Sequence, residues 1–250
     1  CGSDQIWTPW NGGLDPVYWL RFVPEFYLKV AYAPSMANTQ YSIEAQRIIQ
    51  GLAERFDAIS IRETAGKEFL EKLDIKKVEK VLDPTLLLPK EWWERKLNDR
   101  KQKCELASKD YIFAFFLGSN ASHRKTVTKF AKAAGLPVVT FPFQDKITIE
   151  DIRFGNIRLS AESPEDFLYY IKNARYVFTD SLHVLVFSII FEKEFWAFRK
   201  FRDQDKASQN ARIYELLGVA GCSHRLLPDG ISAKEIWKIA SIDYQMVQNN

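Results

Sequence analysis

One segment, residues 176–191, constrains the fold of this chain more than any other. It begins with a β-branched and aromatic run, turns at Thr179-Asp180-Ser181, and continues as an apolar stretch with His183 near its start. This order predicts a buried strand that leads directly into a helix, with His183 in the first helical turn. A helix that starts at the end of a strand directs its free N–H groups and positive dipole end outward, which favours an anion. The corner therefore predicts an anion site that holds a proton donor.

Strand-like and helix-like segments alternate along the whole chain, which is typical of a parallel α/β fold. We expect two Rossmann-like lobes with mostly parallel sheets. The expected strands are residues 29–33, 58–62, 77–82, 111–117, 138–143, 176–179 and 194–198. The expected helices are residues 40–56, 64–73, 208–218 and 231–240, together with one that Gly135 closes and one that Ser163-Pro164 opens. The expected domains are an N-terminal lobe over 1–95, a C-terminal lobe over 110–205 and closing helices over 206–250, with a charged connecting helix and linker over 90–109.

The composition of the chain excludes several classes of protein. Of its 250 residues, 46% are hydrophobic and 14% aromatic, which argues against disorder. The net charge of +3 fits an anionic substrate and is too small for a dedicated nucleic-acid binder. Cys1, Cys104 and Cys222 form no CxxC pair, so they indicate neither a disulfide framework nor a zinc site and favour a reducing cytoplasm. The longest apolar run, residues 184–191, is too short to span a bilayer.

The candidate site residues follow expected strands. In parallel α/β sheets, ligands bind beyond the carboxyl ends of the strands. Arg62 ends the strand at 58–62, and Asp180, Ser181 and His183 follow the strand at 176–179. A guanidinium binds phosphate or carboxylate through two N–H groups, and an imidazole supplies a proton near neutral pH. We therefore expect these side chains to contribute to ligand binding and chemistry.

Six motifs occur along the chain in an order that is similar to one known family. They are Gly2-Ser3-Asp4-Gln5-Ile6-Trp7, Ala31-Tyr32-Ala33-Pro34-Ser35, Ile59-Ser60-Ile61-Arg62-Glu63, Leu82-Asp83-Pro84-Thr85-Leu86-Leu87-Leu88, Thr179-Asp180-Ser181-Leu182-His183 and Asn210-Ala211-Arg212-Ile213. Together they resemble the polysaccharide pyruvyl transferase family. The resemblance implies two Rossmann-like domains in a GT-B-like arrangement. It also implies transfer of the pyruvyl group of phosphoenolpyruvate to sugar hydroxyls of a surface polysaccharide or its lipid-linked precursor as a ketal, with release of phosphate. Members usually carry a further N-terminal segment, so we expect the first lobe to lack its N-terminal part.

The resemblance also implies roles for individual residues. His183 becomes the catalytic acid, which protonates the methylene carbon of phosphoenolpyruvate. The implied substrate-binding residues are Arg62, Asp180, Ser181, Leu182 and Arg212. Several relatives carry arginine where this chain has Ser181, so a hydroxyl and helix N–H groups are expected to replace that charge. Arg212 or the basic stretch 199–202 is expected to supply the missing positive charge.

Other polar and aromatic residues have simpler interpretations. Asp180 either orients His183 or caps the following helix, and capping is favoured. Glu63 is expected to cap the helix that follows it, at 64–73. His123 and His224 stand in polar surroundings and are expected at the surface. The acceptor side could be lined by Ser3, Asp4, Trp7 and Trp10, because aromatic rings stack on sugars, although Trp is more often a core residue.

Two alternative functions remain open at this point. One is a GT-B-like glycosyltransferase that uses a nucleotide sugar. The other is a non-catalytic glycan- or anion-binding protein, for which Ser181 in place of arginine is an argument. We expect no metal and no cofactor apart from the donor substrate phosphoenolpyruvate, and no nucleic-acid partner. We expect a cytoplasmic enzyme, with a peripheral contact at the inner membrane face if the acceptor is lipid-linked.

Overall fold

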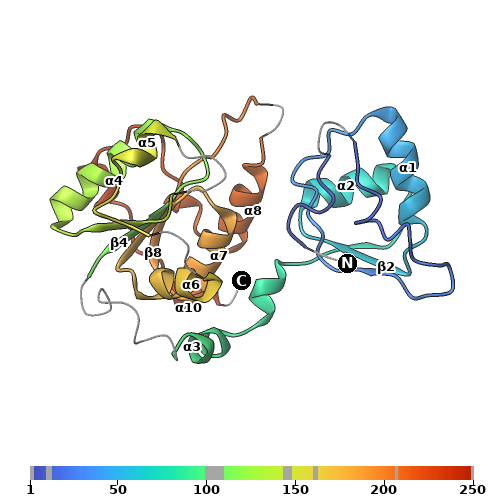
Figure 1. Cartoon of the computed structure of the whole chain (residues 1–250), viewed down its shortest axis with the longest axis horizontal. Coiled ribbons are helices and arrows are strands. Elements are labelled where there is room, and N and C mark those ends of the chain that lie inside the picture. Colours follow the sequence, from blue (N-terminus) through green and yellow to red (C-terminus); the bar gives the residue numbers. More distant parts are fainter. Residues whose placement is uncertain are drawn as a thin grey trace. The chain divides into compact units, whose positions relative to one another are not determined.

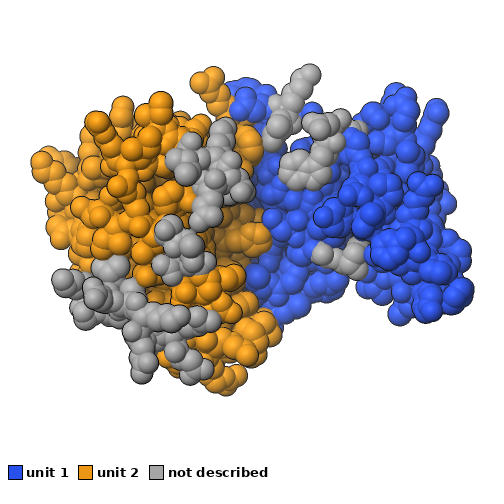
Figure 2. Space-filling model, viewed as in Figure 1, with its two compact units in different colours: residues 1–87, 204–212 blue, residues 88–203, 213–250 orange. Residues whose placement is uncertain are grey.

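The computed structural model describes residues 3–9, 13–98, 110–142, 148–159, 163–205 and 208–248. The chain divides into two compact units, which Figure 2 shows in blue and orange. Unit 1 comprises residues 1–87 and 204–212, and unit 2 comprises residues 88–203 and 213–250. The segment expected to form closing helices, 206–250, is thus divided between the units.

Unit 1 is built on a small parallel sheet. Within the described residues its strands are β1 (Val30–Ala31), β2 (Ala58–Ile61) and β3 (Val78–Lys80), in the order β1-β2-β3. Two helices, α1 (Ile43–Ala53) and α2 (Thr64–Lys72), alternate with these strands (Figure 1). Helix α1 begins where the hydroxyl of Ser42 accepts a hydrogen bond from Ala45 N, and its apolar stripe packs into the core.

Unit 2 contains a larger parallel sheet. In the described residues its strands are β4 (Ile112–Phe115), β5 (Val138–Thr140), β6 (Ile157–Arg158), β7 (Tyr176–Thr179) and β8 (Glu194–Ala197). Their order is β6-β5-β4-β7-β8. The chain runs from β4 outward to β6 and then returns to the other side of β4, so the strand order reverses between β4 and β7. The carboxyl ends of these two strands are where such sheets bind ligands.

The helices of unit 2 cover both faces of its sheet. They are α3 (Lys90–Asn98), α4 (Ala121–Ala134), α5 (Ile149–Ile152), α6 (Pro164–Asn173), α7 (Leu182–Ile190), α8 (Ala211–Val219), α9 (Ala233–Ile236) and α10 (Tyr244–Val247), of which α8 begins at the boundary with unit 1. Along β4, Phe113 packs into one apolar cluster, while Ile112 and Ala114 pack into another. This alternation explains why the run reads as continuously apolar, because both faces of the strand are buried.

The predicted α/β class with mostly parallel sheets is confirmed, since all strand pairs among the described residues are parallel. The predicted helix boundaries at Gly135 and Ser163 are also confirmed. Gly135 ends α4 with a φ of 67°, and Ser163 forms a capping box with Asp166 at the start of α6. The helix expected over 231–240 is shorter, because it is restricted to Ala233–Ile236. Among the residues that the structure describes, no helix is both long and apolar enough to cross a membrane.

Candidate functional site

The corner between β7 and α7 is held in place by side chains at the end of the strand. The hydroxyl of Thr179 donates to Phe115 O at 2.7 Å, which joins the end of β7 to the end of β4. The same hydroxyl accepts from Ser181 N at 3.0 Å. Ser181 occupies the N-cap position of α7, but its side chain makes no capping hydrogen bond. The strand-to-helix corner predicted from the sequence is therefore present.

Asp180 does not cap α7, so the favoured interpretation of this residue is wrong. Its carboxylate accepts hydrogen bonds from Leu117 N at 2.7 Å and Gly118 N at 2.9 Å, in the loop that follows β4. The side chain is buried, and this burial raises the pKa of Asp180 while the two N–H groups oppose the shift. Gly118 leaves no room for a larger residue, because a Cβ there would lie 2.9 Å from Asp180 Oδ2. Asp180 thus ties the loop after β4 to the start of α7.

His183 lies in the first turn of α7, as the sequence predicts. The imidazole and the preceding Leu182 are half-buried, whereas residues 184–188 are buried in the core. His183 thus lies at the carboxyl edge of the sheet, where parallel α/β sheets bind ligands.

Arg62 is buried at the end of β2 in unit 1 and lies at the centre of a cluster of charges. Its guanidinium donates to the carboxylates of Asp4 at 2.7 Å and Glu63 at 3.4 Å, and to that of Asp83. Burial alone lowers the pKa of Arg62, but these carboxylates raise the pKa by more, so the guanidinium stays charged. Glu63 stands at the N-cap of α2 without capping it, because its carboxylate accepts from Ser35 Oγ and Met36 N instead. The predicted capping by the Glu63 side chain is therefore wrong.

Arg212 joins this cluster from the segment 204–212. Its Nη1 donates to Asp4 Oδ1 at 3.2 Å, and its Nη2 donates to Gln209 Oε1 at 2.6 Å. Burial lowers the pKa of Arg212, and the carboxylate of Asp4 opposes this effect. The structure therefore brings together Arg62 and Arg212, two of the residues singled out from the sequence, through a shared carboxylate.

Trp7 is a core residue, which is the alternative that the sequence analysis considered more frequent, whereas His123 is buried against expectation. Trp7 stacks on Trp19 with ring centroids 3.9 Å apart, and both rings are buried, so Trp7 has no face free for a sugar. Trp10 lies outside the described residues. His123 is buried rather than at the surface, with Nε2 2.9 Å from Asp229 Oδ1 and its ring stacked on Phe198. His224 is exposed, as predicted.

The basic stretch 199–202 has internal partners within unit 2. Arg199 Nε donates to Tyr214 Oη at 3.0 Å and lies 3.4 Å from Asp203 Oδ2. The role expected for this stretch or for Arg212, to replace the charge that Ser181 does not supply, stays a prediction. The sequence did not identify Asp4, Glu63 and Asp83 as the partners of Arg62, although each stands in one of the ordered motifs.

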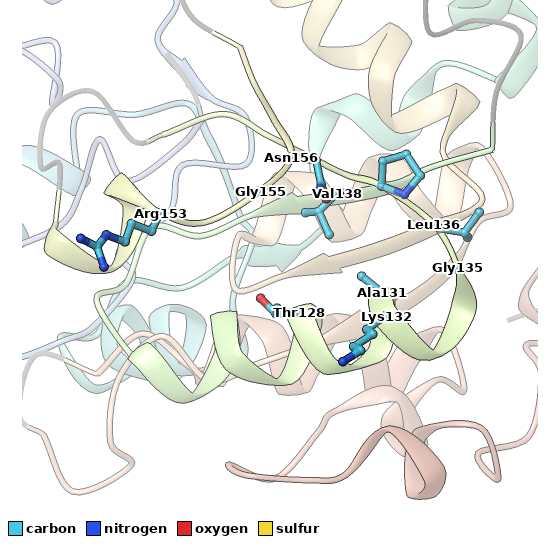
Figure 3. Close-up of a pocket in the computed structure, with 10 residues that line it drawn as sticks. Thr128, Ala131, Lys132, Gly135, Leu136, Val138, Arg153, Gly155 and Asn156 are labelled. Atoms are coloured by element: carbon cyan, nitrogen blue, oxygen red, sulfur yellow. Dashed lines mark hydrogen bonds between the residues drawn. The ribbon is translucent and has the colours of Figure 1, made fainter.

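A cavity of about 470 Å³ lies elsewhere in unit 2 (Figure 3). Its walls come from the end of α4, the turn after it, the start of β5 and the residues before β6. The lining residues are Thr128, Ala131, Lys132, Gly135, Leu136, Pro137, Val138, Arg153, Gly155 and Asn156. These positions lie at the amino ends of the strands, opposite the edge that carries His183. The cavity is therefore separate from the candidate site.

Comparison with known proteins gives one clear result. A family model described as polysaccharide pyruvyl transferase matches residues 1–199. No curated protein matches the chain.

Similar solved structures include UDP-GlcNAc 2-epimerases. The enzyme from Methanocaldococcus jannaschii is 11% identical, with 84% of this chain and 68% of that chain covered and a TM-score of 0.49. Its complex with UDP-GlcNAc and UDP is 11% identical, with 84% and 75% covered and a TM-score of 0.43. The enzyme from Neisseria meningitidis bound to UDP-GlcNAc is 12% identical, with 83% and 64% covered and a TM-score of 0.44. At these scores the likeness supports no statement about function.

Proposed function

We propose that this chain has the activity of its family, because it belongs to the polysaccharide pyruvyl transferase family. The chain is accordingly a transferase. We propose that its donor is phosphoenolpyruvate and that its acceptor is a sugar of a surface polysaccharide or of the lipid-linked precursor. Two hydroxyls of the sugar become bridged by the pyruvyl group as a ketal, and phosphate is released. We propose that this takes place in the cytoplasm, with the enzyme at the inner membrane face when the acceptor is lipid-linked.

In this proposal His183 is the catalytic acid. Its imidazolium gives a proton to the methylene carbon of phosphoenolpyruvate, which becomes a methyl group and leaves an oxocarbenium-like centre at C2. One sugar hydroxyl adds to C2, and the phosphate leaves when the second hydroxyl takes its place. The two hydroxyls release two protons, of which one restores His183 and the other passes to phosphate or solvent. The half-buried position of His183 in the first turn of α7 is compatible with this role.

Arg62 and Arg212 bind the anionic groups of the donor in this proposal. The observation that carries it is their convergence on one carboxylate oxygen, Asp4 Oδ1. Two guanidinium groups that already bind a carboxylate together have the charge and the N–H donors that a carboxylate substrate requires. We also propose that the Ser181 hydroxyl and the first N–H groups of α7, at Leu182, bind an anionic group of the donor.

Phosphate release from phosphoenolpyruvate tests the proposal. The full chain is incubated with phosphoenolpyruvate and a set of candidate glycan acceptors, and free phosphate is measured. We expect acceptor-dependent release in the wild type, loss in His183→Ala, and no change in His224→Ala, which removes an exposed histidine. Release that persists in His183→Ala would exclude His183 as the acid. Tight binding of a nucleotide sugar without binding of phosphoenolpyruvate would favour a glycosyltransferase instead.

A further inference from the structure

The three carboxylates around Arg62 are not held equally. Glu63 also accepts hydrogen bonds from Ser35 Oγ and Met36 N, and Asp83 accepts from Thr85 N and Thr85 Oγ1. Both of these carboxylates are buried. They are therefore fixed parts of the framework that positions Arg62.

Asp4 differs from them in its contacts and in its exposure. The described residues that hydrogen-bond to its carboxylate are Arg62 and Arg212, and both bind the same oxygen, Oδ1. The side chain of Asp4 is 41% exposed, compared with 6% for Asp83. Because Asp4 is already partly in water, its release costs little as long as a ligand carboxylate takes over the contacts with the two buried arginines. Asp4 is therefore the carboxylate of the cluster that can separate from the arginines.

Arg212 carries an N–H group that Asp4 does not satisfy. Its side chain is 10% exposed, and its buried Nε has no hydrogen-bond partner among the described residues. A buried donor without a partner is destabilising, because no hydrogen bond offsets the loss of its hydration. A ligand with two carboxylate oxygens could bind Nε as well as Nη1, which the single oxygen of Asp4 does not do.

The charges of the cluster favour exchange over simple addition. Arg62 and Arg212 carry two positive charges, while Asp4, Glu63 and Asp83 carry three negative ones. An anion that entered beside Asp4 would meet an excess negative charge. An anion that replaces Asp4 meets a balanced set, because the two fixed carboxylates match the two arginines.

We propose that Asp4 is an exchangeable carboxylate, and that the carboxylate of the substrate displaces it from Arg62 and Arg212. The naming of that substrate as phosphoenolpyruvate rests on the proposed function. Asp4 keeps the two guanidinium groups together until a carboxylate that can bind both of them arrives. It controls which anions bind at the donor site and takes no part in the chemical step.

Direct binding measurements on the full chain test this exchange. Three probes are used. Pyruvate carries a carboxylate but no phosphate group, inorganic phosphate carries no carboxylate, and phosphoenolpyruvate, the proposed donor, carries both. The variant Asp4→Asn keeps an oxygen for the arginines but removes the competing charge. We expect it to bind pyruvate and phosphoenolpyruvate about five- to tenfold more tightly than the wild type, because the competent state is more populated. Phosphate binding should change much less.

Two further variants complete this test. Asp74→Asn removes a carboxylate that is 75% exposed elsewhere in unit 1, and it should leave all three affinities unchanged. Asp4→Ser, which cannot reach both arginines, should tighten pyruvate binding as Asp4→Asn does. Weaker or unchanged pyruvate binding in both Asp4 variants overturns the proposal, as does an equal gain for phosphate.

The exchange and the proposed function can fail separately. If the Asp4 variants do not bind pyruvate more tightly while the wild type still releases phosphate through His183, the exchange is wrong and the transferase function stands. If they do bind pyruvate more tightly but phosphoenolpyruvate is never turned over, the carboxylate site stands without the reaction. Absence of pyruvate binding in every variant overturns the exchange.

Discussion

Replacement of Gly118 by alanine tests the contact that fixes the start of α7. A Cβ at this position would lie 2.9 Å from Asp180 Oδ2 and 3.3 Å from the backbone oxygen of Lys200. The first distance is too short, so the carboxylate must move and its hydrogen bonds to Leu117 N and Gly118 N weaken. Overpacking costs about 1–3 kcal/mol, and loss of a hydrogen bond to a charged group costs about 1.5–3 kcal/mol. Because the two costs overlap, we expect a loss of about 2–4 kcal/mol in the free energy of unfolding.

A second glycine of unit 2 provides the control. Gly218 lies within α8, and a Cβ built on it meets no atom within 4 Å. Gly218→Ala should therefore stabilise the protein by about 0.5–1 kcal/mol, because alanine favours the helix. Thermal unfolding followed by circular dichroism measures both variants, and about 2–4 °C of Tm corresponds to 1 kcal/mol at this size. We expect Gly118→Ala to lower the Tm by roughly 5–15 °C and Gly218→Ala to raise it by roughly 1–4 °C.

One outcome would contradict the role given to the contact between Gly118 and Asp180. A Gly118→Ala variant that unfolds at or above the Tm of Gly218→Ala would mean that the close contact with Asp180 does not constrain the loop. The double variant with Asp180→Ala is more specific, because it removes the oxygen that the new Cβ meets. In that background Gly118→Ala should cost at least about 1 kcal/mol less than it does alone.

Two further predictions concern the buried rings. Trp7→Ala removes a ring that stacks on Trp19, so we expect it to cost about 3–5 kcal/mol in urea unfolding, and a loss below about 1 kcal/mol would contradict the buried placement. Burial lowers the pKa of His123 from its ordinary 6.5, although Asp229 opposes this, so the unfolded chain takes up a proton first as the pH falls. The contribution of neutral His123 to the free energy of unfolding should therefore be fully present above pH 6.5 and should be lost as the pH falls towards the lower pKa of the folded state. His123→Phe should reduce this dependence of stability on pH in unfolding experiments between pH 5 and 8.

Features that depend on neighbouring residues in the chain were predictable from the sequence. The corner at Thr179–Ser181, the end of α4 at Gly135 and the start of α6 at Ser163 each follow from the few residues around them. The alternation of strands and helices likewise predicts parallel sheets, because a crossover helix must separate parallel neighbours. The position of His183 in the first turn of α7 was likewise predictable from the residues next to it.

Features that depend on distant residues were not predictable in this way. Asp180 looked like a helix cap because its partner, the backbone at Leu117, is 63 residues away. Arg62 meets Asp4 across 58 residues, and no local pattern encodes that pairing. His123 looked exposed because its sequence neighbours are polar, whereas the ring that covers it belongs to Phe198, in a different part of unit 2.

The division of unit 1 into two chain segments has a consequence for synthesis. Residues 204–212 complete unit 1, but they follow the whole β4–β8 sheet of unit 2 in the sequence. Because a nascent chain emerges from its N-terminus, Asp4 and Arg62 are made long before Arg212. The arginine pair therefore forms only after all strands of unit 2 have been made. A ribosome that stops before residue 204 releases a polypeptide with Arg62 in place and its partner arginine missing.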